Sequence, residues 1–112
     1  MTIITKINTP NINNRPYIIT PNVLNNKTYY FEYFWSIRDN CTYLSIYLLK
    51  DNVKTYILRS SRLVTGNIIS KYIHNVEDWD GILSIWNYDE TKVEQYNQQN
   101  FHTDYFLKFV IE

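Results

Sequence analysis

Cysteine and histidine are the residues of this sequence best suited to nucleophilic chemistry. A cysteine nucleophile needs a nearby imidazole as its base, so Cys41 with His74 or His102 is the arrangement to consider. No family signature flanks Cys41, and its expected place in a hairpin turn offers no helix N-terminus to activate the thiol. The sequence therefore favours Cys41 as an incidental small residue.

Metal-ligating residues occur in two places. His74, Glu77 and His102 could contribute to a transition-metal site, but their spacing matches no closed ligand set. The segment Asp78-Trp79-Asp80-Gly81 has two carboxylates, as a calcium loop would, yet it lacks the later ligands of an EF-hand loop and is better interpreted as a solvated turn. There is also no glycine-rich phosphate loop and no Gly-x-Ser-x-Gly elbow. We therefore predict no enzymatic activity, no metal and no other cofactor.

Aromatic side chains are the most informative chemical feature. The chain has 11 Tyr, three Trp and five Phe, more than so small a core is expected to hide, so some rings should face outward, as they do at interfaces. Two functions fit such rings: a protein–protein interface in an oligomer, or a carbohydrate-binding, lectin-like module in which Trp35, Trp79 or Trp86 stacks on sugars. The candidate interface residues are Tyr29, Tyr33, Trp35, Tyr43, Tyr47, Trp79 and Trp86.

Alternating apolar residues predict the strands that position these rings. From Thr28 the chain places Tyr29, Phe31, Tyr33, Trp35 and Ile37 on one face of an extended segment. A second run alternates Leu44, Ile46 and Leu48 with Tyr43, Ser45, Tyr47 and Leu49, and a third covers Val53–Arg59. Polar turns separate these runs, so they predict an antiparallel meander with one face to bury and one to show.

The remaining segments complete the predicted fold. Ile82–Tyr88 and Tyr105–Ile111 read as strands, Ile68–His74 as a short strand or a bent connection, and the polar stretch around Glu90–Gln98 as the place of a helical turn. Gly66 is one of only two glycines, which predicts a positive backbone φ there. The sequence thus predicts an all-β fold: a small antiparallel β-barrel or β-sandwich built on a meander.

The N-terminal residues differ in composition from the rest. Residues 1–27 interleave Pro10, Pro16 and Pro21 with many Asn residues, and both types restrict strands to short lengths. We therefore expect residues 1–27 to form an extended arm with short strands such as Ile3–Ile7 and Tyr17–Thr20. Residues 28–112 are expected to form a single β domain that folds without most of this arm.

Charge and hydropathy exclude several partners. Lys plus Arg and Asp plus Glu each number 11, so no excess of positive charge is available for nucleic acid or an anionic membrane. No stretch approaches the length of a transmembrane helix, and Met1–Ile7 is too interrupted for a signal peptide. A single cysteine favours synthesis in a reducing cytoplasm. We predict neither a nucleic-acid-binding patch nor membrane association.

The order of elements from residue 24 onward has a further meaning. An aromatic strand ends in Trp35 with Arg38 just after it, followed by Tyr43-Leu44-Ser45-Ile46-Tyr47 and a polar turn at Asp51-Asn52. Next come Arg62-Leu63-Val64-Thr65-Gly66-Asn67-Ile68-Ile69, then Gly81-Ile82-Leu83 and the terminal aromatic strand Tyr105–Ile111. In this order residues 24–112 resemble the baseplate plug proteins of contractile-tailed phages.

The resemblance implies a structural rather than an enzymatic role. It implies a subunit of the contractile-tail baseplate, located in the virion near the end of the tail tube and the central hub and synthesised in the bacterial cytoplasm. Its partners would be baseplate hub or tail-tube proteins and copies of itself in a symmetric assembly. The carbohydrate-binding module remains the alternative.

Overall fold

The computed structural model describes residues 2–13, 17–73, 79, 81–89, 91–92 and 94–111. Two single helical turns, η1 (Ile69–Tyr72) and α1 (Phe101–Asp104), accompany the strands. The described residues form seven strands: β1 (Ile3–Asn8), β2 (Tyr17–Leu24), β3 (Lys27–Ser36), β4 (Cys41–Lys50), β5 (Val53–Arg62), β6 (Ile82–Asn87) and β7 (Tyr105–Ile111). The all-β prediction is confirmed.

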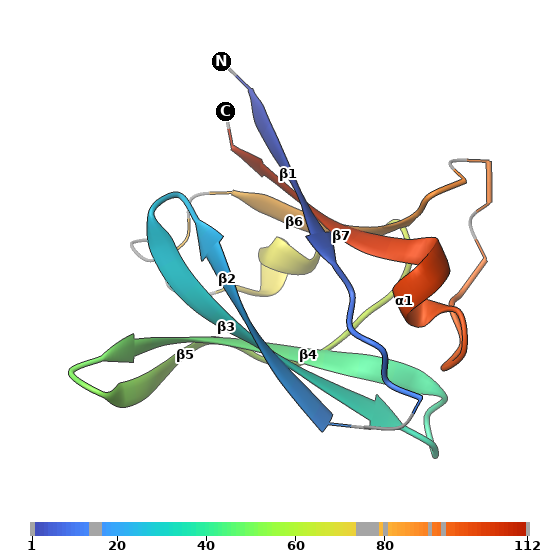
Figure 1. Cartoon of the computed structure of the whole chain (residues 1–112), viewed down its shortest axis with the longest axis horizontal. Coiled ribbons are helices and arrows are strands. Elements are labelled where there is room, and N and C mark those ends of the chain that lie inside the picture. The colour runs from blue at the N-terminus through green and yellow to red at the C-terminus, as the bar shows by residue number, and fades with distance from the viewer. Residues whose placement is uncertain are drawn as a thin grey trace.

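The strands are arranged in two antiparallel sheets (Figure 1). One is three-stranded, in the order β1-β7-β6, and the other is four-stranded, in the order β2-β3-β4-β5. The four-stranded sheet contains the predicted meander as β3, β4 and β5. Of the two predicted architectures, the described strands form the sandwich-like one, since they make two separate sheets and no closed barrel.

The hairpin turns depend on residues that tolerate positive φ. Asn25 and Asn26 connect β2 to β3 with φ of 52° and 65°, and Asp51 and Asn52 connect β4 to β5 with φ of 52° and 64°. Two successive residues of positive φ match the twist of antiparallel strands, and Asn and Asp are the non-glycine residues best suited to them. Gly66 has a φ of 86°, which confirms the prediction for that residue.

The N-terminal residues take part in both sheets. β1 pairs with β7 along its whole length, from Ile3 opposite Ile111 to Asn8 opposite Phe106. β2 pairs with β3 and continues through Pro21, which is tolerated because β2 is an edge strand. Three side chains of residues 1–27 lie in the hydrophobic core, namely Ile7, Ile12 and Leu24. The predicted arm is therefore built into the sandwich.

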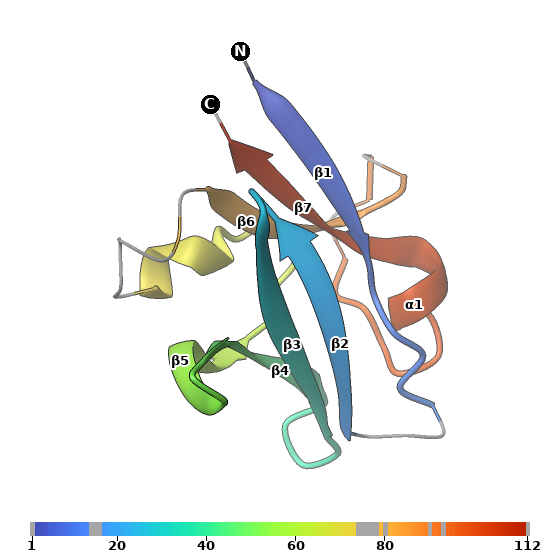
Figure 2. The same cartoon turned by 60° about the vertical axis from the view of Figure 1, so that its left-hand side comes forward.

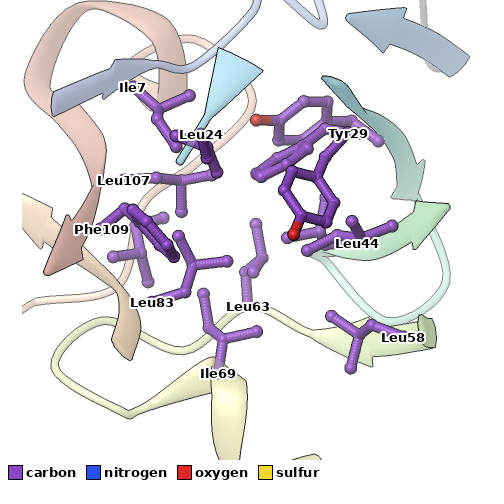
Figure 3. Close-up of a cluster of buried hydrophobic side chains, with 14 of the residues drawn as sticks. Ile7, Leu24, Tyr29, Leu44, Leu58, Leu63, Ile69, Leu83, Leu107 and Phe109 are labelled. Carbon is purple, nitrogen blue, oxygen red and sulfur yellow. The ribbon is translucent and has the colours of Figure 1, made fainter. Parts of the chain in front are cut away.

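The core lies between the two sheets (Figure 3). On β3 the buried aromatic residues are those that the alternation placed on one face, Tyr29, Phe31, Tyr33 and Trp35, whereas Ile37 lies beyond the strand and is exposed. Trp79 joins the sheets, because its ring meets Tyr29 at 5.2 Å and Phe109 at 5.0 Å between centroids, both edge to face. Such aromatic pairs add to the free energy of burial.

Two connections differ from the sequence prediction. Ile69–Tyr72, expected within a short strand or bend, is the 3₁₀ helix η1, and only Ile68 makes a bridge, to Ser84. The expected helical turn lies later, at Phe101–Asp104, and the described part of residues 90–98 contains none. The Asn97 side chain accepts the N–H groups of Gln99 and Asn100, as an N-cap does, so the helical conformation begins only after this residue.

Candidate interaction surface

One face of the four-stranded sheet points away from the core and carries rings from all four strands. Residues directly opposite in register share a face, so two rows cross the sheet. One row runs from Tyr17 through Phe34 to Tyr43, and the other runs from Tyr30 through Tyr47 to Tyr56. We call these six residues, together with Glu32 between the rows, the outer aromatic face.

Glu32 is the polar centre of this face. Although it is a carboxylate on the outside of a sheet, only 8% of the residue is exposed. The Tyr56 hydroxyl donates to its Oε1 at 2.6 Å, the Tyr17 hydroxyl donates to its Oε2, and Lys54 Nζ lies 3.9 Å from Oε2. A buried carboxylate needs such donors, and here they tie β2 and β5 to β3.

These hydrogen bonds change how the tyrosines titrate. The hydrogen bond to Glu32 raises the pKa of Tyr17 to about 12, and the same carboxylate raises the pKa of Tyr56. At the edge of the face, the Tyr43 hydroxyl donates to Asp39 Oδ2 at 2.8 Å, which raises the pKa of Tyr43 to about 12 and lowers that of Asp39. The phenols therefore stay protonated as donors well above neutral pH.

Ring and cation contacts fix the second row. Tyr30 stacks on Tyr47 with centroids 5.0 Å apart, and Tyr47 meets Tyr56 at 5.4 Å. Lys54 lies over the Tyr47 ring at 4.9 Å, and the Arg59 guanidinium lies over the Tyr56 ring at 4.2 Å. Rings held in this way have little rotamer freedom left to lose when another surface covers them.

The first row is the more exposed of the two. Tyr17 is 52% exposed and Phe34 is 49% exposed, while Tyr43 is half-buried. These three residues, with Glu32 and Tyr56, line a shallow hollow of about 530 Å³. Beside it Ile19 and Val23 of β2 are also exposed, so the face continues as an apolar patch to the sheet edge. A contiguous apolar patch of this kind marks a site of interaction.

The predicted interface residues divide between this face and the core. Tyr43 and Tyr47 lie together on the outer aromatic face. Tyr29, Tyr33, Trp35 and Trp79 are buried between the sheets, so their rings are unavailable on the surface of the single chain. Trp86 is half-buried on the three-stranded sheet, where Lys108 lies over its ring at 5.3 Å. The structure therefore places only two of the seven on the outer aromatic face, and of these Tyr47 is itself only 5% exposed.

Four residues of the outer aromatic face were missed from the sequence: Tyr17, Tyr30, Phe34 and Tyr56. A signal for β3 was present, because Glu32 has the same strand parity as Tyr30 and Phe34. A charged residue marks the face of a strand that is directed to solvent. Tyr17 and Tyr56 could be placed only once the register of β2 and β5 was known.

Among the residues that the structure describes, those considered for chemistry form no metal-binding group. Cys41 begins β4 and is fully buried. His74, Glu77, Asp78 and Asp80 lie outside the described residues, and among the residues that are described no group of His, Cys, Asp or Glu could hold a metal ion. Likewise, no helix in the described part of the chain is long and apolar enough to cross a membrane.

Comparison with protein families identifies the chain. Residues 4–112 match a family model, which defines the chain as a structural component of a phage baseplate and hence of the virion. It belongs to the family described as cyanophage baseplate Pam3 plug gp18, so the predicted relation to baseplate plug proteins is confirmed. Membership implies that the chain interacts with other baseplate proteins. No curated protein matches the chain.

Proposed function

We propose that this chain is an assembly subunit of a contractile-tail baseplate, where it binds neighbouring proteins near the tube end and the central hub through the outer aromatic face. The observation that carries the proposal is the pair of half-exposed rings, Tyr17 and Phe34, on a face whose other rings are already fixed. In this proposal the chain has no enzymatic activity and acts only by protein–protein contacts.

The physical chemistry of the face supports a role in binding. A few aromatic anchors usually dominate the free energy of an interface, and Tyr and Trp combine a large apolar area with a hydrogen-bonding group. Here the anchors are Tyr17, Phe34 and Tyr43, and Glu32 holds the first of them in place. Because the rings are ordered before binding, little conformational entropy is lost on contact. Copies of this chain in a symmetric assembly are a further proposed partner.

Incorporation into particles tests the proposal. A phage that lacks the gene would be complemented with chains carrying Phe34→Ser or Tyr43→Ser, and the chain would be quantified by mass spectrometry in gradient-purified particles. Ile82→Ser is the matched control, because Ile82 is 46% exposed, like Phe34, but lies on the other sheet. We expect both outer-face variants to be depleted and the control to be incorporated normally. Equal incorporation of all three would contradict the proposal.

Copy number tests the proposed position. A subunit at the centre of the baseplate is expected at a fixed low number per particle, a small multiple of three relative to the tube protein. The same purified particles give this ratio when the tube protein serves as the internal standard. A chain that is absent from intact particles and free in the lysate would rule out the position and the assembly role together.

No specific observation favours the carbohydrate-binding alternative. Trp35 and Trp79 are buried, and Lys108 lies over the ring of Trp86. A panel of glycans titrated against intrinsic Trp fluorescence would still test it, because a saturable shift requires a sugar close to an indole.

A further inference from the structure

The free edge of β5 borders a second groove, which adjoins the outer aromatic face at Tyr56. The groove has a volume of about 910 Å³ and runs between residues 56–62 of β5 and the segment that leads into η1. Figure 2 shows η1 as the yellow helical turn beyond the edge of β5. The walls of the groove include Ile57, Arg59 and Arg62 on one side and Asn67, Ile68 and Ile69 on the other.

Of the sheet edges, β5 is one that can accept another strand, and it is the one that borders the groove. β2 contains Pro21, which cannot donate a ladder hydrogen bond, and β6 is already bonded by the bridge of Ile68 to Ser84 and by the Gly66 N–H to the Ile85 carbonyl at 2.9 Å. β5 spans Val53–Arg62, and no described residue pairs with its outer side. Half of the backbone polar groups of an edge strand point outward and can pair with an added strand.

The side chains around the groove specify what such a strand should carry. Arg62 lies opposite Tyr43, and Arg59 lies over the Tyr56 ring, so both cations lie on the outer side of the sheet. The inner wall is apolar and includes Ile68, which is 49% exposed. Alternate residues of an extended chain point to opposite sides. A strand in the groove would therefore present apolar side chains inward and acidic side chains outward.

Charge complementarity supports the acidic side chains. The described residues that line the groove include two arginines and no Asp or Glu. Within the described chain, neither Arg59 nor Arg62 forms an ion pair. Guanidinium groups bind carboxylates in a charge-assisted geometry that a point charge does not reproduce.

A bulge in β5 adds selectivity. Ser60 has a φ of 48°, its N–H donates to the Ser45 hydroxyl at 2.8 Å, and the register with β4 is interrupted beside it. Such bulges blunt an edge against indiscriminate pairing, since the regular ladder is broken. A segment that pairs here over a short length must gain the rest of its binding free energy from side chains.

We propose that the groove at the β5 edge binds an extended segment of a partner protein, in which apolar and acidic residues alternate, as an additional strand. This site adjoins the outer aromatic face, with which it shares Tyr56, and adds a second contact of a different chemical kind. Main-chain hydrogen bonds to β5 would give affinity, and the two arginines would select the acidic side chains.

Nuclear magnetic resonance titration of the isotope-labelled full chain tests the site. The probe is a short synthetic peptide of alternating Val and Glu, added to millimolar concentration. We expect amide signals of residues 56–62 and 67–69 to shift. The same peptide with Lys in place of Glu should leave these signals unmoved, because it loses charge complementarity. A peptide with alternate backbone amides methylated should also leave them unmoved, because it loses the ladder hydrogen bonds.

Paired variants separate specific binding from general charge effects. Arg59→Gln with Arg62→Gln should weaken binding of the acidic peptide about tenfold, the scale of a lost charge-assisted hydrogen bond. Arg38→Gln with Lys92→Gln removes the same charge from exposed positions outside the groove and should bind like the unaltered chain.

Three results would overturn the proposal. They are equal shifts with acidic and basic peptides, shifts that map outside the groove, and an undisturbed groove at millimolar peptide. If a thymidine oligonucleotide shifted the groove signals, the ligand would be a nucleic acid instead of an acidic segment. If concentrating the chain alone shifted them, the ligand would be a second copy of the chain. The experiment needs no virion, so its failure would leave the assembly role of the outer aromatic face standing.

Discussion

The two faces of the four-stranded sheet both carry aromatic rings, but the surroundings of these rings differ. Along β3, Tyr29, Phe31 and Tyr33 point into the core, while Tyr30 and Phe34 point outward. The inner rings contact other rings and aliphatic side chains, whereas the outer ones surround a buried carboxylate, Glu32. Aromatic content alone therefore does not distinguish the buried face of this sheet from its outward face. The two faces are distinguished by strand parity and by the position of Glu32 among the outer rings.

The largest expected effect is on the inner face. Phe31→Ala removes a fully buried ring from the centre of β3 and leaves a cavity between the sheets. We expect it to lower the free energy of unfolding by about 3–5 kcal/mol, measured by chemical denaturation. A loss similar to that of an outer-face variant would break the comparison, because it would mean that the two faces contribute equally to stability.

Removing the polar centre of the outer face should have an intermediate effect. Glu32→Ala deprives the hydroxyls of Tyr17 and Tyr56 of their acceptor. It thereby removes the side-chain hydrogen bonds that tie the edge strands β2 and β5 to β3. We expect a loss of about 1–3 kcal/mol in the same denaturation experiment, since both phenols can turn to water. Glu32→Gln retains an acceptor and should lose less. An equal loss in both variants would show that the hydrogen bonds are not the cause.

At alkaline pH, a tyrosine of the outer face and one of the core keep their protons for different reasons. Tyr17 on the outer face and Tyr96 in the core both have a pKa raised from 10.0 to about 12, the first by its hydrogen bond to Glu32 and the second by burial. Between these values the unfolded chain loses phenolic protons that the folded chain keeps, so stability should fall as pH rises from about 10 to about 12.

Absorbance titration of the tyrosinates checks the cause of each shift. Glu32→Ala should return the pKa of Tyr17 toward its ordinary value and leave that of Tyr96 high, with Tyr17→Phe and Tyr96→Phe identifying the two signals. A titration that Glu32→Ala does not change would contradict the role given to the carboxylate.

The smallest expected effect on stability belongs to the exposed row. Phe34→Ser changes a half-exposed ring that contributes little to the core, so the free energy of unfolding should change by no more than about 0.5 kcal/mol. This small effect makes the variant suitable for the particle experiment, because its depletion could not be attributed to unfolding. A loss as large as that of Phe31→Ala would disqualify that experiment.

The sequence predicted the strands of this fold better than its surfaces. Period-two alternation located β3, β4, β6 and β7 and grouped Tyr29, Tyr33 and Trp35 on one face of β3. It did not indicate which face is buried, and these three predicted interface residues lie in the core. The interface residues were harder to identify, because Tyr is amphipathic and occurs on both faces. Tyr17 and Tyr56 meet at Glu32 only through the register of three strands, and register depends on turns and a bulge that local patterns do not specify.

Helical turns were predicted least well. The polar residues near Asn97 bond to their own backbone, and the turn that does form, Phe101–Asp104, is held by a buried ring rather than by helix propensity. The Thr9 hydroxyl also ties this turn to the N-terminal residues, because it donates to the Phe101 carbonyl oxygen at 2.7 Å. A pattern of a few neighbouring residues cannot indicate contacts between residues so distant in the sequence.

The pairing of β1 with β7 sets an order for folding during synthesis. Of the described strands, β1 leaves the ribosome before the others, yet it pairs with β7, which leaves after them, whereas β2 to β5 are joined in sequence by short turns. Non-local pairing is slow because a long loop must close before any contact compensates for the lost entropy. The four-stranded sheet can therefore form on the nascent chain, and Ile3–Asn8 must wait for Tyr105–Ile111 before the core is closed.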